Sequence, residues 1–242
     1  MQIRVDRKEE HLTMTTSRQT RLGPEHLRRI RGAGSMDHFL HNPDAQPADP
    51  AGWWRTLCWV TERVAVSGDL DRARIAAQVA EWVAAGITDI VDVRGEANDS
   101  RIVGELAPGI RYHWIGTNDD GNGQSDDWFE AVAQAVGGAL EDPDRRVVVH
   151  CHLGCNRGPS AAYAALVAQG GHPIEVLDLI RSARPVASMM YAGHAVVWWA
   201  RREGLAADEV VEWHDRVWEW HAANPIDVPY CIEQMGRRRH AA

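Results

Sequence analysis

A short run of β-branched residues followed by a cysteine loop constrains most strongly how this chain can fold. Residues 147–149 are three consecutive valines, which is typical of a buried strand. The run ends at a polar loop with the sequence His-Cys-His-Leu-Gly-Cys-Asn-Arg-Gly at 150–158, and an Ala-rich segment at 161–169 follows. Because alanine favours helix, the sequence predicts a strand that enters a helix through a tight loop.

The five residues between Cys151 and Arg157 make a loop just long enough to curl around a small anion. In such a loop successive backbone amides turn inward, and the N-terminus of the next helix points at the same centre. These amides, the helix end and the Arg157 guanidinium should all favour a thiolate at Cys151. Since an arginine can hold a phosphate through two parallel hydrogen bonds, Cys151 is a candidate nucleophile facing a bound phosphate.

The order His-Cys, five residues, then Arg after an apolar strand resembles the signature of the protein tyrosine and dual-specificity phosphatases, and flanking similarity covers about residues 53–204. The resemblance implies an α/β fold with a central, mostly parallel sheet flanked by helices. It also implies a cysteine-dependent phosphatase that hydrolyses phosphomonoesters through a cysteinyl phosphate. Phosphotyrosine is the expected substrate, with phosphoserine and phosphothreonine as further candidates, and neither a cofactor nor a metal is expected.

The resemblance assigns roles to individual residues. Cys151 attacks phosphorus, Arg157 holds the phosphoryl oxygens, and Asp119 protonates the leaving oxygen, with Asp120 as the alternative acid. His150 supports the cysteine loop. The expected substrate-binding residues of the loop are His152, Leu153, Gly154, Cys155, Asn156 and Gly158.

One loop position departs from the family pattern. The family usually has Ser or Thr directly after the arginine, where the hydroxyl helps the cysteine leave, but here Gly158 and Pro159 come before Ser160. The hydroxyl of Ser160 is therefore the candidate replacement.

The acid residues lie in a loop rich in Gly, Asn and Asp, at 116–123, one predicted helix upstream of the cysteine strand. That is where the family places its general-acid loop. Ser125 should cap the intervening helix.

The remaining pattern predicts strands at 59–66, 87–93 and 110–115, a helix at 70–85, a polar loop at 94–101, and two helices after the cysteine helix, starting at 173 and 191. Asp92, inside a buried strand, is expected to be structural.

The two ends of the chain extend beyond this predicted domain, which spans 53–204. Residues 1–52 are polar and lack apolar periodicity, which predicts an N-terminal arm that is partly disordered. Residues 205–242 predict a C-terminal helical extension and a basic tail. The extension is expected either to pack back on the domain or to pair with a second subunit, so a homodimer through this helix is an open alternative.

Composition narrows the partners and the compartment. A net charge of −8 argues against nucleic acid as the main partner, because phosphate backbones need a basic face. Four cysteines in 242 residues are too few for a disulfide framework, which favours the cytoplasm. No apolar run reaches the length of a membrane span, so no membrane partner is expected. The expected partner is a phosphorylated protein or a small phosphomonoester.

Alternative functions remain open at this stage. A rhodanese-like sulfurtransferase also uses a cysteine in an anion-binding loop, although the upstream aspartate loop favours a phosphatase. A non-catalytic phosphate-binding module is the third hypothesis, together with a zinc site built from His150, Cys151, His152 and Cys155. The zinc site is disfavoured, because the sequence has no second pair of Cys or His ligands at the spacing of a zinc finger. Cys155 either fills space or forms a reversible disulfide with Cys151.

Overall fold

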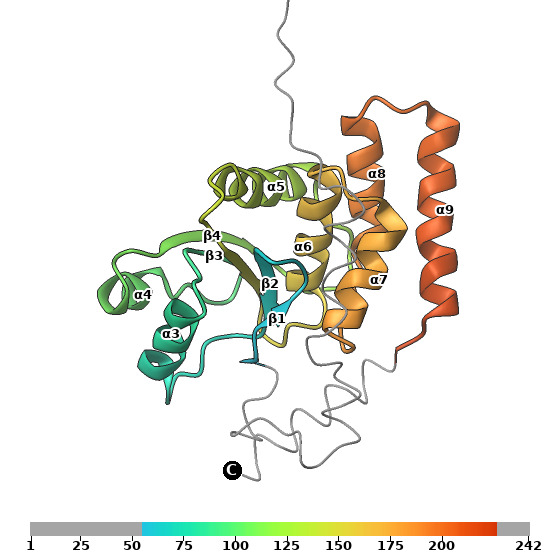
Figure 1. Cartoon of the computed structure of the whole chain (residues 1–242). Helices are drawn as coiled ribbons and strands as arrows, with labels where there is room; N and C mark the ends of the chain where they lie inside the picture. Colours follow the sequence, from blue (N-terminus) through green and yellow to red (C-terminus); the bar gives the residue numbers. More distant parts are fainter. Residues whose placement is uncertain (1–54, 227–242) are drawn as a thin grey trace, which may run out of the picture.

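The computed structural model of this protein describes residues 55–226, which form a five-stranded sheet between two groups of helices (Figure 1). The strand order is β1-β2-β5-β3-β4, with β1 antiparallel to β2 and the other neighbours parallel. The predicted α/β fold with a mostly parallel sheet is confirmed. The predicted N-terminal arm and basic tail lie outside the described residues. The strands are β1 Cys58–Trp59, β2 Val64–Ser67, β3 Asp89–Arg94, β4 Arg111–Thr117 and β5 Val147–His150.

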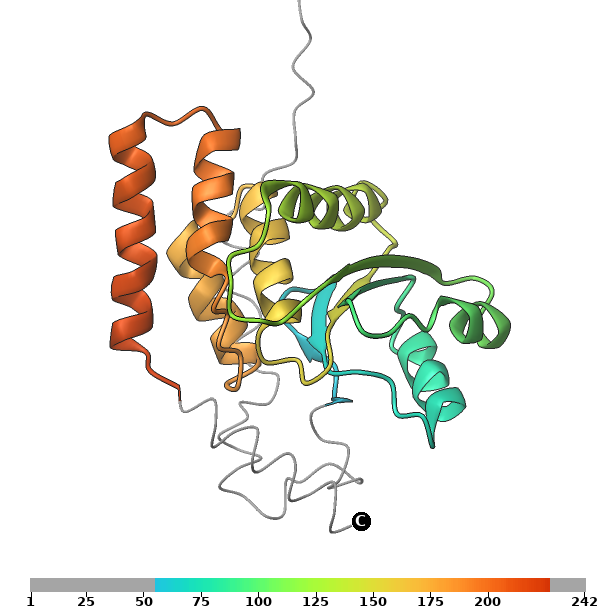
Figure 2. The same ribbon diagram turned by 180° about the vertical axis from the view of Figure 1, so that it is seen from behind.

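Every residue of the three central strands, β2, β5 and β3, is buried. Since alternate residues of a strand face opposite sides of the sheet, both faces of the sheet must be covered. On one face, strand residues join a large core and are covered by α5 and α6, and on the other face they join a smaller core under α3 and α4 (Figures 1 and 2). The large core takes Val64, Val66, Val91, Val93, Val147 and Val149, and the smaller core takes Ala65, Ile90 and Val148.

Helices of the described chain follow the strands in an alternating order, as parallel sheets require. α3 spans Ile75–Ala84, α4 Ser100–Leu106, α5 Asp126–Leu140 and α6 Arg157–Ala168. α7 (Pro173–Ala183), α8 (Ala192–Arg202) and α9 (Ala207–Ala223) complete the larger helical layer. None of these helices is both long enough and apolar enough to cross a bilayer.

The predicted strand at 59–66 and the predicted polar loop at 94–101 both differ from the structure. The predicted strand at 59–66 is a hairpin, because the Thr61 hydroxyl accepts hydrogen bonds from the amides of Arg63 and Val64 and turns the chain between β1 and β2. The predicted polar loop at 94–101 leads into the helix α4. Val103 is the one fully buried residue of that helix, and a single apolar anchor gives no periodic signal.

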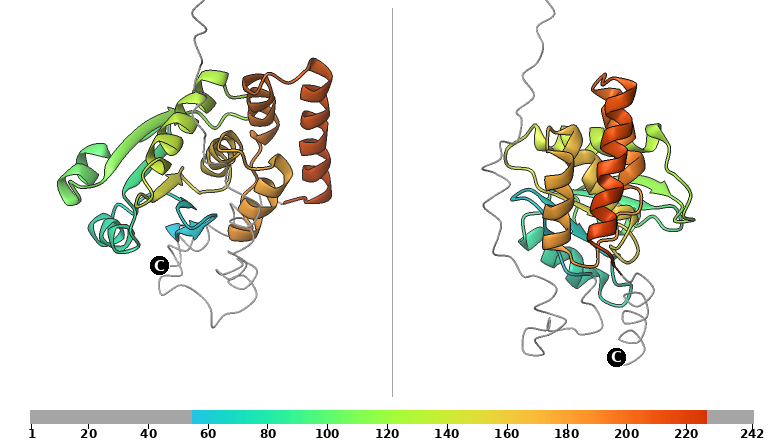
Figure 3. Two further views of the ribbon diagram at one scale, coloured as in Figure 1. Left: turned by 45° about the horizontal axis from the view of Figure 1, so that its top comes forward. Right: turned by 90° about the vertical axis from the view of Figure 1, so that its right-hand side faces the viewer.

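The C-terminal helix α9 packs back on the domain, which was one of the two predicted alternatives. Val217 and Trp220 are buried, and the Trp220 indole donates to Asp178 of α7 at 2.7 Å. The guanidinium of Arg181 lies over the Trp220 ring, 5.0 Å from its centroid. α8 and α9 run side by side (Figures 2 and 3). A homodimer through α9, in which Trp218 is exposed, stays a prediction.

Candidate active site

The cysteine loop lies at the edge of the sheet where the parallel strands end. β2, β3, β4 and β5 are parallel, so the segments after Ser67, Arg94, Thr117 and His150 all leave the sheet at this edge. Binding sites in open α/β sheets form at this edge. The fold therefore brings four distant parts of the sequence around Cys151.

Backbone carbonyls of the loop are bonded on its outer side. The amide of Asp69 donates to the His152 carbonyl at 2.9 Å, and the buried Arg184 donates to the carbonyls of Gly154 at 2.6 Å and Leu153 at 3.0 Å. The amide of Ser188 donates to the Cys155 carbonyl at 2.7 Å. In a trans peptide the carbonyl and the following amide point in opposite directions. The amides of residues 153–156 are therefore turned toward the centre of the loop, as the sequence predicts.

Gly154 is required by this geometry. Its φ is +67°, and an added Cβ would lie 2.4 Å from the Arg184 guanidinium and 2.7 Å from the Ser67 carbonyl oxygen. A residue with a side chain would be strained and would push Arg184 from the loop.

The thiol of Cys151 is buried, and its pKa is raised, whereas the loop sequence alone predicts a lowered one. Burial raises the pKa of Cys151 and outweighs the amides of Gly158 and Gly154 and the charge of Arg157, which lower it. The negative charge of Asp119 also raises the pKa of Cys151. The loop thus supplies the expected stabilising groups, but desolvation of the sulfur is the larger effect.

Arg157 is the first residue of α6, which begins four residues before the predicted start of the helix at 161. Its guanidinium is held by Glu96, in the segment after β3, through a bidentate pair of 2.6 and 2.8 Å. Nη1 also donates to the Thr117 carbonyl at 2.9 Å. The hydrogen bonds from Arg157 lower the pKa of Glu96 to about 2. Glu96 is a site residue that the sequence analysis missed.

The two aspartates of the acid loop have different surroundings. Asp119 Oδ2 lies 3.3 Å from Arg157 Nε, and Asp119 Oδ1 accepts from Asn156 Nδ2 at 2.7 Å. Asp120 is exposed, and its carboxylate accepts from the amide of Asn122 at 3.0 Å in a turn of the loop. Of the two predicted candidates, Asp119 is the one in contact with the cysteine loop.

Position 158, and not Ser160, faces the sulfur. A Cβ added at Gly158 would lie 3.4 Å from the Cys151 sulfur. The Ser160 hydroxyl instead donates to Asn156 Oδ1 at 3.4 Å and accepts from the Tyr191 amide at 3.3 Å. Within residues 55–226 no hydrogen bond joins Ser160 to Cys151, so its role here is to support Asn156 and the segment before α8.

His150 and Asp92 lie beneath the loop. The His150 ring is wholly buried, 3.7 Å from Asp92 Oδ1, and packs edge-on against Trp82. Burial lowers the pKa of His150. Asp92 accepts two hydrogen bonds from the Arg94 guanidinium, at 2.8 and 2.7 Å, and one from the Tyr112 hydroxyl at 2.6 Å. These contacts agree with the structural role predicted for Asp92.

The remaining predicted loop residues lie at the rim or in the interior. His152 Nδ1 lies 3.1 Å from Asp69, which also pairs with Arg55 at 2.8 Å. Cys155 and Cys151 are both buried, and among the described residues neither is part of a disulfide. Among the described residues no group of three or more His, Cys, Asp or Glu side chains is arranged to hold a metal ion.

Tyr191 and Asp69 complete the set of contacts that sequence analysis missed. Tyr191 donates to Asp119 Oδ1 at 2.9 Å and comes from the start of a predicted helix, where nothing in the local pattern pointed to the site. Asp69 follows β2, and Glu96 follows β3. The sequence signal for Asp69 and Glu96 was their position just beyond a predicted strand. Residues that follow parallel strands gather at one edge of the sheet, where a binding site is expected.

Comparisons with known proteins give structural matches and no sequence matches. No protein-family model and no curated protein matches this sequence. The chain is similar to Tk-PTP in its active form, with a TM-score of 0.51 and 20% identity over 62% of this chain and 99% of that chain. A glycine-to-alanine mutant form of Tk-PTP gives a TM-score of 0.51 and 18% identity over 63% of this chain and 99% of that chain. Human DUSP28 gives a TM-score of 0.48 and 20% identity over 66% of this chain and 94% of that chain. At the identities of the two Tk-PTP forms, the similarity shows the fold, and the fold predicted by resemblance is confirmed.

Proposed function

We propose that this chain, whose fold is similar to that of Tk-PTP, is a cysteine-dependent phosphatase of the dual-specificity type that hydrolyses phosphomonoesters. Phosphotyrosine is the proposed substrate, with phosphoserine and phosphothreonine as further candidates. The site residues would be Cys151 as nucleophile, Arg157 as the group that holds the phosphoryl oxygens, and Asp119 as the general acid. The loop amides from 153 to 156 would hold the remaining oxygens.

The observation that carries the proposal is the buried Nε donor of Arg157, which makes no hydrogen bond within the described residues. Arg157 Nε faces Asp119 Oδ2 in an ion pair at 3.3 Å, while both terminal nitrogens are anchored by Glu96. The charge of Arg157 lowers the pKa of Cys151, against the effect of burial. A phosphoryl oxygen at the centre of the loop would satisfy both Arg157 Nε and the inward amides, and buried donors rarely stay without an acceptor.

In the proposed reaction the Cys151 sulfur, after losing its proton, forms a bond to phosphorus while the bond from phosphorus to the ester oxygen breaks. Asp119 transfers a proton to that oxygen, which makes an alcohol or phenol the leaving group. Water then attacks phosphorus and gives a proton to the Asp119 carboxylate, while the bond from sulfur to phosphorus breaks and releases inorganic phosphate and the Cys151 thiolate. Because the pKa of Cys151 is raised, the amides and Arg157 must supply the thiolate against the cost of burial.

A sulfurtransferase is the competing enzyme class. What favours the phosphatase is Asp119, because transfer of sulfur from thiosulfate to cyanide needs no acid beside the loop, whereas expulsion of an alkoxide does. Assays with p-nitrophenyl phosphate and with thiosulfate and cyanide would separate the two. Turnover of thiosulfate without turnover of the phosphate ester would overturn the proposal.

Asp119→Asn should slow the hydrolysis of esters with poor leaving groups by about a hundredfold or more, the usual contribution of a general acid. An ester with a good leaving group, such as p-nitrophenyl phosphate, should be affected much less. The same variant removes a negative charge that raises the pKa of Cys151, so that pKa should fall. Steady-state rates and the pH dependence of iodoacetamide alkylation measure the two effects.

Asp120→Asn is the matched control for this variant, because Asp120 is exposed and bonded within its own turn. In the Asp120→Asn variant the hydrolysis rate should depend on the leaving group as it does in the wild type. The assignment of the acid to Asp119 is wrong if Asp120→Asn gives the larger loss.

The glycine at 158 should make breakdown of the cysteinyl phosphate slow, because no hydroxyl faces the sulfur there. We expect a burst of p-nitrophenol, about one equivalent per site, before steady turnover. Gly158→Ser would place a hydroxyl next to the sulfur, since the added Cβ lies 3.4 Å away, and should shrink the burst. Gly158→Ala adds the same Cβ without the hydroxyl and controls for the tight 3.1 Å contact of that Cβ with the Cys151 nitrogen. Equal bursts in the two variants would exclude an effect of the hydroxyl.

A further inference from the structure

The segment between α7 and α8 lies against the cysteine loop and is bonded to it at successive residues. The amides of Ser188 and Met189 donate to the Cys155 carbonyl at 2.7 and 3.4 Å. The amide of Met190 donates to Asn156 Oδ1 at 2.7 Å. The position of this segment is therefore fixed by the same loop that surrounds Cys151.

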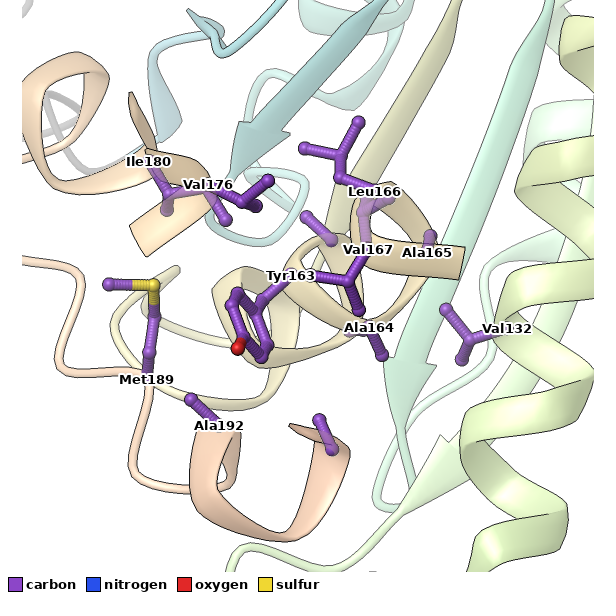
Figure 4. Close-up of a cluster of buried hydrophobic side chains, with 14 of the residues drawn as sticks. Val132, Tyr163, Ala164, Ala165, Leu166, Val167, Val176, Ile180, Met189 and Ala192 are labelled. Carbon is purple, nitrogen blue, oxygen red and sulfur yellow. The ribbon is translucent and has the colours of Figure 1, made fainter. Parts of the chain in front are cut away.

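Met189, in the middle of this segment, has a left-handed backbone conformation. Its φ is 51°, and it is the single non-glycine residue with a positive φ among residues 55–226. Met189 itself is buried, and Figure 4 shows its side chain in the cluster formed with Tyr163 and Ile180. Such a conformation persists only where surrounding contacts enforce it, and it often marks a functional constraint. After this residue Met190 is 53% exposed, whereas Tyr191 is 1% exposed.

Tyr191 turns inward and reaches the acid loop. Its hydroxyl donates to Asp119 Oδ1 at 2.9 Å, and Asn156 Nδ2 donates to the same oxygen at 2.7 Å. Burial raises the pKa of Tyr191, and the hydrogen bond to Asp119 raises it further, so the hydroxyl keeps its proton and remains a donor. Two donors on one carboxylate oxygen leave the other oxygen, Oδ2, to face Arg157 Nε at 3.3 Å.

We propose that Tyr191 is a positioning residue for Asp119, which fixes Oδ1 so that Oδ2 carries the proton delivered to the leaving oxygen. This inference rests on the proposed phosphatase function. As sulfur bonds to phosphorus and the ester bond breaks, the proton moves from Oδ2 to the departing oxygen, and Asp119 becomes a carboxylate. Oδ1 keeps its two donors throughout, so the carboxyl group does not rotate between the acid and the carboxylate forms.

The physical advantage is orientation. A general acid acts only when its proton lies within hydrogen-bond reach of the leaving oxygen. A loop rich in glycine, at 116–123, would by itself leave that carboxyl group free to turn. Tyr191 and Asn156 come from different segments, so together they hold the carboxyl group from two sides.

Tyr191→Phe removes one donor and keeps the buried ring. We expect kcat for a poor leaving group, such as an alkyl phosphate, to fall about tenfold, which is part of the loss expected for removing the acid itself. With p-nitrophenyl phosphate kcat should change less than about twofold, because a good leaving group needs little protonation. KM should be nearly unchanged for both substrates, since Tyr191 donates to Asp119 and not to the phosphate.

Tyr163→Phe is the matched control. Tyr163 is also a fully buried tyrosine, and its hydroxyl has no hydrogen-bond partner among the described residues. Tyr163→Phe also removes one buried hydroxyl group from the core, but it removes no hydrogen-bond donor from Asp119. The ratio of the rates on the two substrates should therefore stay at the wild-type value.

A double mutant separates positioning from a general structural effect. In an Asp119→Asn background Tyr191→Phe should cause no further selective loss, because the acid is already absent. A uniform loss on both substrates, no loss, or a selective loss that persists without Asp119 would each overturn the role of Tyr191. If Cys151→Ser keeps full activity, the proposed function fails first, so the two failures are distinguishable.

Discussion

Cys151→Ser should abolish turnover of p-nitrophenyl phosphate, with a loss of about four orders of magnitude or more, because a serine hydroxyl in this loop has no adjacent base to activate it. Binding of phosphate should survive. The groups expected to hold the anion are the inward amides and Arg157, and the substitution leaves both in place. Steady-state rates and the affinity for vanadate or phosphate, measured by calorimetry, check the two halves of this expectation.

Cys58→Ser is the control for the loss of a buried thiol. Cys58 is a free cysteine in β1, outside the cysteine loop. It should retain most of the wild-type turnover. Turnover that persists in Cys151→Ser and fails in Cys58→Ser would remove Cys151 from the mechanism.

Arg157→Ala should weaken both phosphate binding and turnover, the latter by about three orders of magnitude or more, the scale seen when an arginine that holds a transferring phosphoryl group is lost. The reason is twofold. The buried Nε donor disappears, and the carboxylates of Glu96 and Asp119, now without their cation, repel an approaching phosphate. Rates over a range of substrate concentration separate kcat from KM.

Arg157→Lys refines the test. Lysine keeps the charge but lacks the planar fork that binds Glu96 through two nitrogens. It should recover part of the phosphate binding and little of the turnover. Full recovery by lysine would mean that charge alone is required and that the Nε donor is not needed to hold the phosphate.

Arg145→Ala is the matched control, because Arg145 also forms a bidentate pair, with Asp89 at the opposite end of β3. It breaks a comparable ion pair far along the strand from the loop. We expect it to lower the free energy of unfolding and to leave kcat nearly unchanged. A similar loss of kcat in both variants would assign the Arg157 effect to stability.

Part of the site follows from neighbouring residues alone. The strand of valines at 147–149, the cysteine loop and the helix after it are adjacent in sequence, so the spacing of Cys151 and Arg157 predicts that they face one centre. The cap formed by Ser125 is equally local, and its side chain accepts from the Trp128 amide at 3.2 Å. The burial of the central strands also follows from their apolar composition.

Other properties depend on how the chain brings distant segments together. Glu96 reaches Arg157, and Tyr191 reaches Asp119, across sequence separations of 61 and 72 residues. The choice between Asp119 and Asp120 also depends on such contacts, since the two residues are adjacent and of the same type. Local sequence patterns describe each segment separately and contain no information about which partner it meets across the sheet edge.

The pKa of Cys151 shows the same division most clearly. The sequence by itself determined the loop that holds the sulfur, with its amides, helix end and arginine, and all three groups favour the thiolate. Only the tertiary structure decided how deeply the sulfur is buried and that Asp119 and Glu96 lie against Arg157. Desolvation depends on every atom that excludes water from the sulfur, and those atoms come from the whole fold, so the direction of the pKa shift is a property of the tertiary structure and not of the loop.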